Sequence, residues 1–122
     1  MSKTIMIVDD EKDIVHALKT VMATHGFTVV TASDGHQAFK MLSSITPDLM
    51  IVDLTMPVLD GWRLAMKVRQ EERFKKTPII VLSALIDSQR DPEVYEPGSI
   101  YMTKPFDVFE ILKKVKELLG VV

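Results

Sequence analysis

The chain has 122 residues, of which 47% are hydrophobic and 26% are charged, and its formal net charge is -2. A chain of this length and composition is expected to fold as a single domain over residues 1–122, and a disordered chain is excluded. Acidic and basic residues are interspersed, so no direct binding of nucleic acid or of an anionic membrane is expected. The lack of cysteine excludes disulfides and thiolate metal sites. No apolar run is long enough for a signal-peptide core or a membrane span, so a cytoplasmic location is expected.

Short apolar runs alternate along the chain with longer stretches of helical periodicity. This alternation predicts an α/β fold in which helices cover both faces of a mostly parallel sheet. The five predicted strands are Thr4–Val8, Thr28–Thr31, Leu49–Val52, Ile79–Leu82 and Ile100–Thr103.

Four of the intervening or following stretches carry an apolar stripe with the period of a helix. The stripes are Ile14, Ala17, Leu18, Val21 and Met22; Ala38, Met41, Leu42 and Ile45; Leu64, Ala65 and Val68; and Ile111, Leu112, Val115, Leu118 and Leu119. Gly26 is placed to end the first of these helices.

The stretch before the fifth strand differs, because proline inside a helix costs about 3 kcal/mol. Pro92 and Pro97 therefore predict a loop from Leu85 to Arg90, followed by at most a short helix from about Pro92 to Glu96.

Polar residues that can carry chemistry follow the ends of four predicted strands. They are Asp9 and Asp10, then Asp53, Ser83 and Lys104. Ligands of open parallel sheets bind beyond the carboxyl ends of the strands, so these side chains are expected to converge on one edge.

The charges of this set predict a metal ion. Three clustered carboxylates repel one another, and Lys104 alone does not neutralise them, so a hard divalent cation such as Mg²⁺ is expected. A metal beside a lysine and a hydroxyl can cradle a phosphoryl group, and a carboxylate can act as its nucleophile. The sequence therefore predicts phosphoryl transfer at this edge.

Four runs of residues resemble, in order and spacing, the receiver domain of two-component response regulators, including the chemotaxis receivers. The runs are Val8-Asp9-Asp10-Glu11, the segment from Val52 to Gly61, Ser83-Ala84, and Tyr101-Met102-Thr103-Lys104-Pro105-Phe106. The resemblance covers essentially the whole chain. It implies a flavodoxin-like (βα)5 fold with the strand order 2-1-3-4-5, an order that comes from the family and not from the apolar pattern.

The resemblance also implies roles for the acidic residues. Asp53 would be the phosphoacceptor, and Asp10, Asp53 and the backbone carbonyl of Thr55 would bind Mg²⁺, with Asp9 acting mainly through water. Lys104 would pair with the phosphoryl group.

A conformational switch is implied for two further residues. Ser83 would move toward the phosphoryl group, and Tyr101 would change rotamer in response. The Lys104–Pro105 bond resembles the cis peptide of the family. Two features depart from the family pattern. The chain is one residue shorter between Gly98 and Tyr101, and prolines precede this stretch. Both features lie in the region through which receivers usually pass their signal to other proteins.

Each residue alone has an ordinary structural explanation. Asp9 and Asp10 are typical helix caps, Ser83 is a typical local hydrogen-bonding residue, and Tyr101 is a typical packing residue. The joint occurrence of these elements at strand ends, in family order, favours the receiver interpretation. The histidines share no metal spacing and are interpreted as surface or helix residues; they are His16, His25 and His36.

The expected function is therefore that of a regulatory phosphoacceptor and not of a turnover enzyme. Asp53 would receive its phosphoryl group from a histidine kinase or phosphotransfer protein and lose it slowly, and a downstream partner or output domain would read the change. One alternative is an aspartyl phosphatase, but Thr55 occupies the position where such an enzyme needs a second acid. The other is a scaffold that is never phosphorylated, against which the complete acidic set argues.

Overall fold

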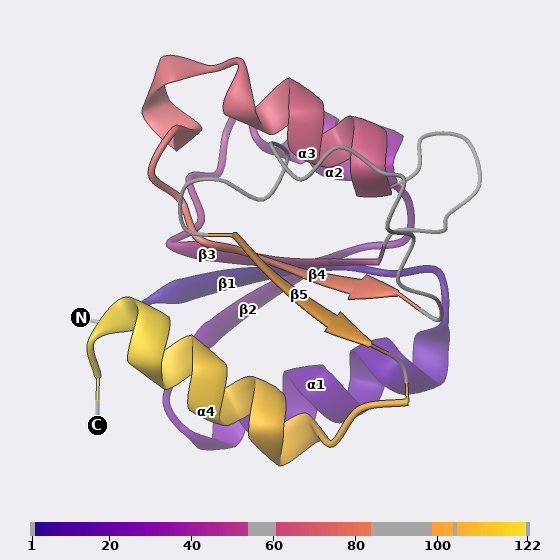
Figure 1. The fold of residues 1–122 in the computed structure, drawn as a ribbon, viewed down its shortest axis with the longest axis vertical. Coiled ribbons are helices and arrows are strands. Elements are labelled where there is room, and N and C mark those ends of the chain that lie inside the picture. Colours follow the sequence, from indigo (N-terminus) through magenta and orange to yellow (C-terminus); the bar gives the residue numbers. More distant parts are fainter. Residues whose placement is uncertain (1, 54–60, 84–98, 104, 122) are drawn as a thin grey trace.

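Five parallel strands form one sheet in the order β2-β1-β3-β4-β5, which confirms the predicted fold class and strand order (Figure 1). The computed structural model describes residues 2–53, 61–83, 99–103 and 105–121. The strands are β1 (Thr4–Val8), β2 (Thr28–Ala32), β3 (Leu49–Asp53), β4 (Ile79–Ser83) and β5 (Ser99–Thr103). The helices are α1 (Lys12–Thr24), α2 (Gly35–Met41), α3 (Gly61–Arg69) and α4 (Val108–Leu119), with a 3₁₀ turn, η1 (Glu72–Phe74).

Four strands are one residue longer than predicted, and two of the additions matter for the site. Asp53 and Ser83 are the last residues of β3 and β4, not the first residues after them. The reason is the register, because Asp53 still pairs with Leu82 and Ser83 with Thr103. Polar side chains end the apolar run in the sequence, whereas the backbone ladder continues one step further.

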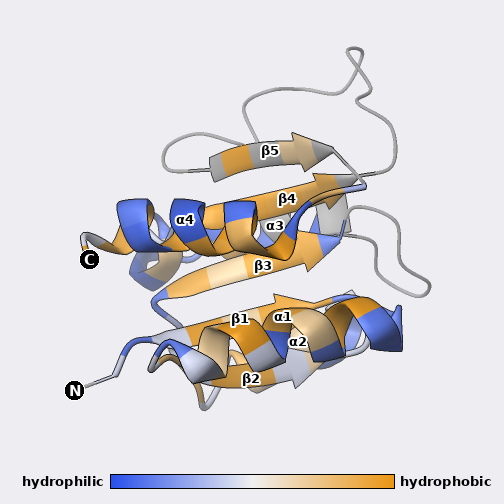
Figure 2. Cartoon of the chain, turned by 90° about the horizontal axis from the view of Figure 1, so that it is seen from below, coloured by the Kyte–Doolittle hydropathy of each residue, from blue (hydrophilic) through white to orange (hydrophobic). Residues whose placement is uncertain are grey.

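The sheet lies between two layers of helices, with α2 and α3 on one face and α1 and α4 on the other (Figure 1). Because successive strand residues point to opposite faces, each of the strands β1 to β4 contributes to two cores. Met6 and Val8 of β1 pack in the α2–α3 core, while Ile5 and Ile7 pack in the α1–α4 core. Figure 2 shows these hydrophobic strands beside helices in which hydrophobic and hydrophilic residues alternate.

The helix ends follow from local chemistry. Gly26 lies just after α1 and has a φ of +90, a left-handed conformation that favours glycine. This agrees with the prediction that Gly26 ends the helix. The second helix is shorter than its stripe predicted, because Ile45 lies beyond the end of α2. The hydroxyls of Ser43 and Ser44 donate to the carbonyls of Lys40 and Met41, so side chains satisfy the end of the helix.

Two predictions of local structure lie outside the described residues. They are the loop and short helix between Leu85 and Glu96, and the cis form of the Lys104–Pro105 bond. Among the helices that the structure does describe, none is long and apolar enough to cross a membrane.

Candidate functional site

Parallel pairing of β1 and β3 brings two carboxylates together at the carboxyl edge of the sheet. Val8 pairs with Val52, so Asp9 and Asp53 occupy the next step of the two chains. Ile7 and Ile51, two positions earlier in the chain, pack in the core under α1 and α4. Since side chains two positions apart in a strand lie on the same face, Asp9 and Asp53 are on this face too. Asp9 is 2% exposed and Asp53 is 3% exposed.

Asp10 completes an acidic cluster with these two residues. One carboxylate oxygen of each of Asp9, Asp10 and Asp53 lies within 4.8 Å of the other two, and Asp10 is exposed at the mouth of the cluster. Two oxygens on opposite sides of one Mg²⁺ ion are about 4.2 Å apart, twice the metal–oxygen bond length. Neighbouring oxygens around the ion are closer, about 3 Å apart, so the three carboxylates, which lie within 4.8 Å of one another, would have to draw closer together to bind one small hard cation.

The turn after β1 fixes the position of Asp9. Its backbone N–H donates to the Ala32 carbonyl (3.1 Å), and its Oδ1 accepts from the Glu11 N–H (2.9 Å). Glu11 is the N-cap residue of α1, and its side chain makes no capping hydrogen bond. Neither Asp9 nor Asp10 stands at the cap position, although the Asp9 carboxylate satisfies the Glu11 N–H just before the helix. In α2, by contrast, the N-cap residue Asp34 itself accepts from the Gln37 N–H.

The remaining predicted site residues are placed in part. The backbone of Ser83 ends β4 beside Thr103, and Tyr101 lies in β5 beside Val81. Ser83 is therefore on the strand next to Asp53, and Tyr101 is one strand further along the sheet. Their side chains are not described. Thr55 and Lys104 lie outside the described residues.

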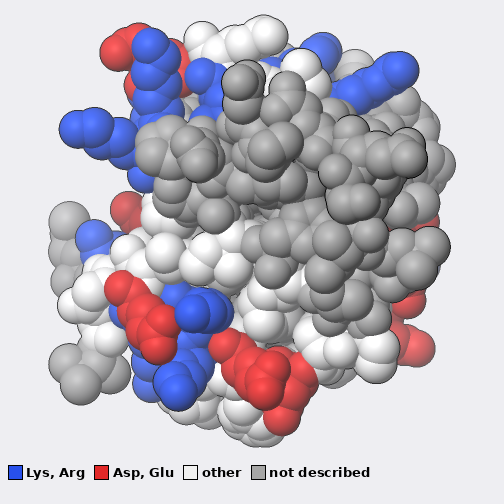
Figure 3. Space-filling model, in the orientation of Figure 1, with Lys and Arg blue, Asp and Glu red and all other residues white. Residues whose placement is uncertain are grey.

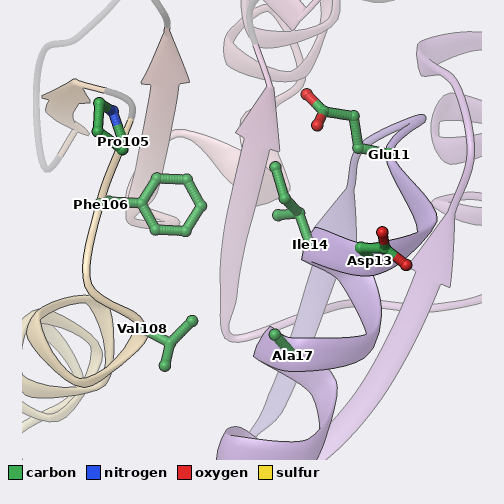
Figure 4. Close-up of a pocket in the computed structure, with 7 residues that line it drawn as sticks. All are labelled: Glu11, Asp13, Ile14, Ala17, Pro105, Phe106 and Val108. Atoms are coloured by element: carbon green, nitrogen blue, oxygen red, sulfur yellow. The ribbon is translucent and has the colours of Figure 1, made fainter.

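A groove of about 530 Å³ opens beside the site between the start of α1 and the segment before α4. In Figure 4 the ring of Phe106 points across the groove toward Ile14, with Ala17 and Val108 further along the two walls. The carboxylates of Glu11 and Asp13 lie at its α1 side. Sequence reasoning did not identify this groove, because its two walls are about ninety positions apart; Phe106 entered only as a motif residue.

A second cavity of about 280 Å³ shares Asp9 and Asp10 with the acidic cluster. Its other walls come from α1 and from the end of β2: Lys12, Val15, His16, Lys19, Thr31, Ala32 and Ser33. From the sequence, His16 is interpreted as a surface or helix residue, and none of these side chains is given a role in the site. The spacing of Lys12, His16 and Lys19, which places them on one helix face, was the available signal.

Comparison with known families gives one match, to the response regulator receiver domain, over residues 5–116. The chain is 39% identical over 121 residues to the alkaline phosphatase synthesis transcriptional regulatory protein PhoP of Bacillus subtilis, which covers 98% of this chain and 49% of PhoP. It is 34% identical over 115 residues to the protein PilG of Pseudomonas aeruginosa, covering 92% of this chain and 84% of PilG. The chain thus spans about half the length of PhoP and of several other curated relatives.

One solved structure with the same fold is a complex with Mg²⁺. The response regulator protein TrrA from Thermotoga maritima, in complex with Mg²⁺ and BeF, superimposes with a TM-score of 0.83 at 34% identity. The match covers 96% of this chain and 99% of TrrA.

Proposed function

We propose, because the chain belongs to the family of response regulator receiver domains, that it accepts a phosphoryl group on Asp53 in a Mg²⁺-dependent reaction. The chain is a phosphoryl-accepting signalling switch of the two-component type. The identity of the acceptor, the metal and the roles of single residues are the proposal.

The observation that carries the proposal is the acidic cluster itself. Asp53 ends a buried strand with its carboxylate beside those of Asp9 and Asp10. Three carboxylates at this separation repel one another strongly, so the arrangement favours a bound cation. Mg²⁺ bound there would neutralise charge on the phosphoryl oxygens.

The chain's own residues would then perform an in-line transfer. An oxygen of Asp53 attacks phosphorus while the bond from phosphorus to the donor breaks, and the electron pair of that bond leaves with the donor. Lys104 would balance the charge of the product, and Ser83 would donate a hydrogen bond to it. Slow hydrolysis of the aspartyl phosphate would reset the switch, which makes the chain a regulatory acceptor.

The phosphodonor would be a histidine kinase or phosphotransfer protein. The groove between Ile14 and Phe106 supports contact with such a partner, because most of its lining is apolar and Glu11, which also lines it, directly follows Asp10 of the acidic cluster. A downstream protein, or an output domain in a longer chain, would read the phosphorylated state; several relatives are about twice as long as this chain.

Intact mass spectrometry after incubation with acetyl phosphate and Mg²⁺ tests the proposal. We expect the wild-type chain to gain one phosphoryl group, and Asp53→Asn or removal of Mg²⁺ by a chelator to abolish the gain. Asp13→Asn, which removes an exposed acid of α1 outside the cluster, is the control and should retain it. Full phosphorylation of Asp53→Asn would show that the acceptor is another residue.

A further inference from the structure

The wall that α1 contributes to the cavity beside the acidic cluster is basic, while Asp9 and Asp10 of the cluster line another part of the same cavity. Lys12, His16 and Lys19 lie at positions i, i+4 and i+7 of α1 and therefore share one helix face. All three side chains are exposed, and within the described part of the chain none of them has an ion pair with a carboxylate. Their charge is available to a ligand.

Polar groups from β2 complete the opposite wall. Thr31 and Ser33 each contribute a hydroxyl, and Ala32 between them is buried and holds the Asp9 N–H through its carbonyl. The hydroxyl of Ser33 also donates to Gln37 at 3.0 Å, which orients that side chain at the rim. The single proton of the Ser33 hydroxyl is engaged in that bond, so the donors that the cavity offers an oxyanion are the Thr31 hydroxyl and the two lysine ammonium groups.

The location of the cavity relates it to the reaction. Asp9 and Asp10 form part of its wall and part of the acidic cluster, so the two spaces are contiguous. A donor whose phosphoryl group lies against Asp53 must place its remaining atoms in space next to the cluster. About 280 Å³ is the volume of roughly nine liquid water molecules, enough for a small carboxylate but not for a protein element.

We propose that this cavity is a subsite for the leaving group of small acyl phosphate donors. The inference rests on the proposed function. When an Asp53 oxygen bonds to phosphorus and the bond between phosphorus and the acyl oxygen breaks, both electrons of that bond stay on the acyl oxygen and a carboxylate leaves. Lys12 and Lys19 lie where they stabilise that developing negative charge, which favours donors with an anionic leaving group.

The test compares two donors and two variants that lose the same charge. Lys12→Gln with Lys19→Gln removes two positive charges from the cavity, and Lys113→Gln with Lys116→Gln removes two from α4. The donors are acetyl phosphate, which releases acetate, and phosphoramidate, which releases neutral ammonia. The initial rate of mass gain is measured with Mg²⁺ at low and at high salt.

The cavity variant is expected to react with acetyl phosphate roughly three- to tenfold more slowly than wild type at low salt, with a smaller difference at high salt. Its rate with phosphoramidate, and both rates of the α4 variant, should change less than about twofold. A second readout is titration with sodium acetate, in which the amide resonances of residues 12–19 should shift in wild type but not in the cavity variant.

Three results would overturn the inference. They are unchanged acetyl phosphate kinetics in the cavity variant, equal slowing with both donors, and slowing confined to transfer from a phosphohistidine protein, which would assign the cavity to an acidic partner surface. Absence of any mass gain in wild type would instead refute the proposed function, so the two failures are distinguishable.

Discussion

Asp9 and Asp53 are the buried charged side chains of the described core, and both belong to the acidic cluster. Burial of a carboxylate costs free energy, and a second carboxylate nearby adds repulsion. A fold selected only for stability has no reason to place three acids at one strand edge. The cluster is therefore expected to lower the stability of the metal-free chain in exchange for its function.

Neutralising one acid of the cluster should stabilise the metal-free protein. We expect Asp10→Asn or Asp53→Asn to raise the free energy of unfolding in chelator by about 1 to 2 kcal/mol, which is roughly 3 to 8 °C in Tm. The same variants should lose most of the stabilisation that Mg²⁺ gives to wild type. Thermal unfolding with and without Mg²⁺ measures both effects.

The matched control is again Asp13→Asn, because Asp13 is an exposed acid in the first turn of α1. A carboxylate there interacts favourably with the helix dipole, so its loss should lower Tm slightly. If both cluster variants melt at or below the wild-type temperature in chelator, the acids do not repel one another as the structure implies.

Residue positions in the site were predictable from the sequence only where the strand topology alone determines them. The convergence of Asp9 and Asp53 follows from the ends of parallel strands, so the rule for open sheets was sufficient. The cavity lined by Lys12 and Lys19 was missed, because nothing in the sequence shows that the end of β2 forms its opposite wall. Predicting this cavity would require knowing where α1 lies relative to the end of β2.

At the level of elements, β1, β3 and β4 were predictable because they are almost continuous apolar runs buried on both faces. The edge strand β2 is only partly buried, and its short run between turn residues was the signal. The 3₁₀ turn η1 was not predicted. Phe74 is its single apolar residue among charged neighbours, and one apolar residue has no periodicity to detect. The structure nevertheless buries Phe74 completely, and Arg69 Nη1 donates to the Phe74 carbonyl at 2.8 Å, which holds the turn against α3.

Phe74 should accordingly be among the costly positions of the α2–α3 core. We expect Phe74→Ala to lower the free energy of unfolding by about 3 to 5 kcal/mol, the usual range for a fully buried phenylalanine. Phe109→Ala is the comparison, because Phe109 is 62% exposed on α4 and should change stability by less than about 0.5 kcal/mol. Urea unfolding of both variants checks the difference, and similar midpoints would contradict the burial of Phe74.

The adjacent strands β4 and β5 suggest how phosphorylation is read. Ser83 ends β4 and pairs with Thr103 of the neighbouring β5, and Tyr101 lies two residues before Thr103. A movement of Ser83 therefore reaches Tyr101 through directly paired strands. We expect Ser83→Ala to retain phosphorylation of Asp53 while the amide shifts around Tyr101 that accompany it shrink. Ser99→Ala, at the opposite end of β5, is the control. A full wild-type response in Ser83→Ala would separate the hydroxyl from the switch.

On the scale of the whole molecule, charge is distributed without one dominant sign. Figure 3 shows Lys and Arg side chains beside Asp and Glu side chains among the described residues of the visible face. Together with the net charge of -2, this arrangement gives no extended field for a polyanion. Recognition is therefore expected to depend on local shape, which directs attention to the apolar groove beside the site.

The groove exists only because the fold brings two distant segments together. Ile14 and Ala17 come from the first helix, and Phe106 and Val108 come from the segment that leads into the last helix. The helices α1 and α4 lie on the same face of the sheet, so the groove depends on the whole topology (Figure 1).

Substitutions in the groove should separate the two routes of phosphorylation. We expect Ile14→Ser combined with Phe106→Ala to slow transfer from a phosphohistidine donor protein about tenfold or more, because apolar contact with the donor is lost. Acetyl phosphate needs no such contact, so its rate should stay within about twofold of wild type. Phe109→Ala removes an exposed aromatic ring outside the groove and should leave both routes intact. Rapid-quench measurement with a kinase that phosphorylates wild type gives the first rate, and intact mass gives the second. Equal slowing of both routes would mean that the substitutions damage the acidic cluster, and no slowing of either would mean that the donor docks elsewhere.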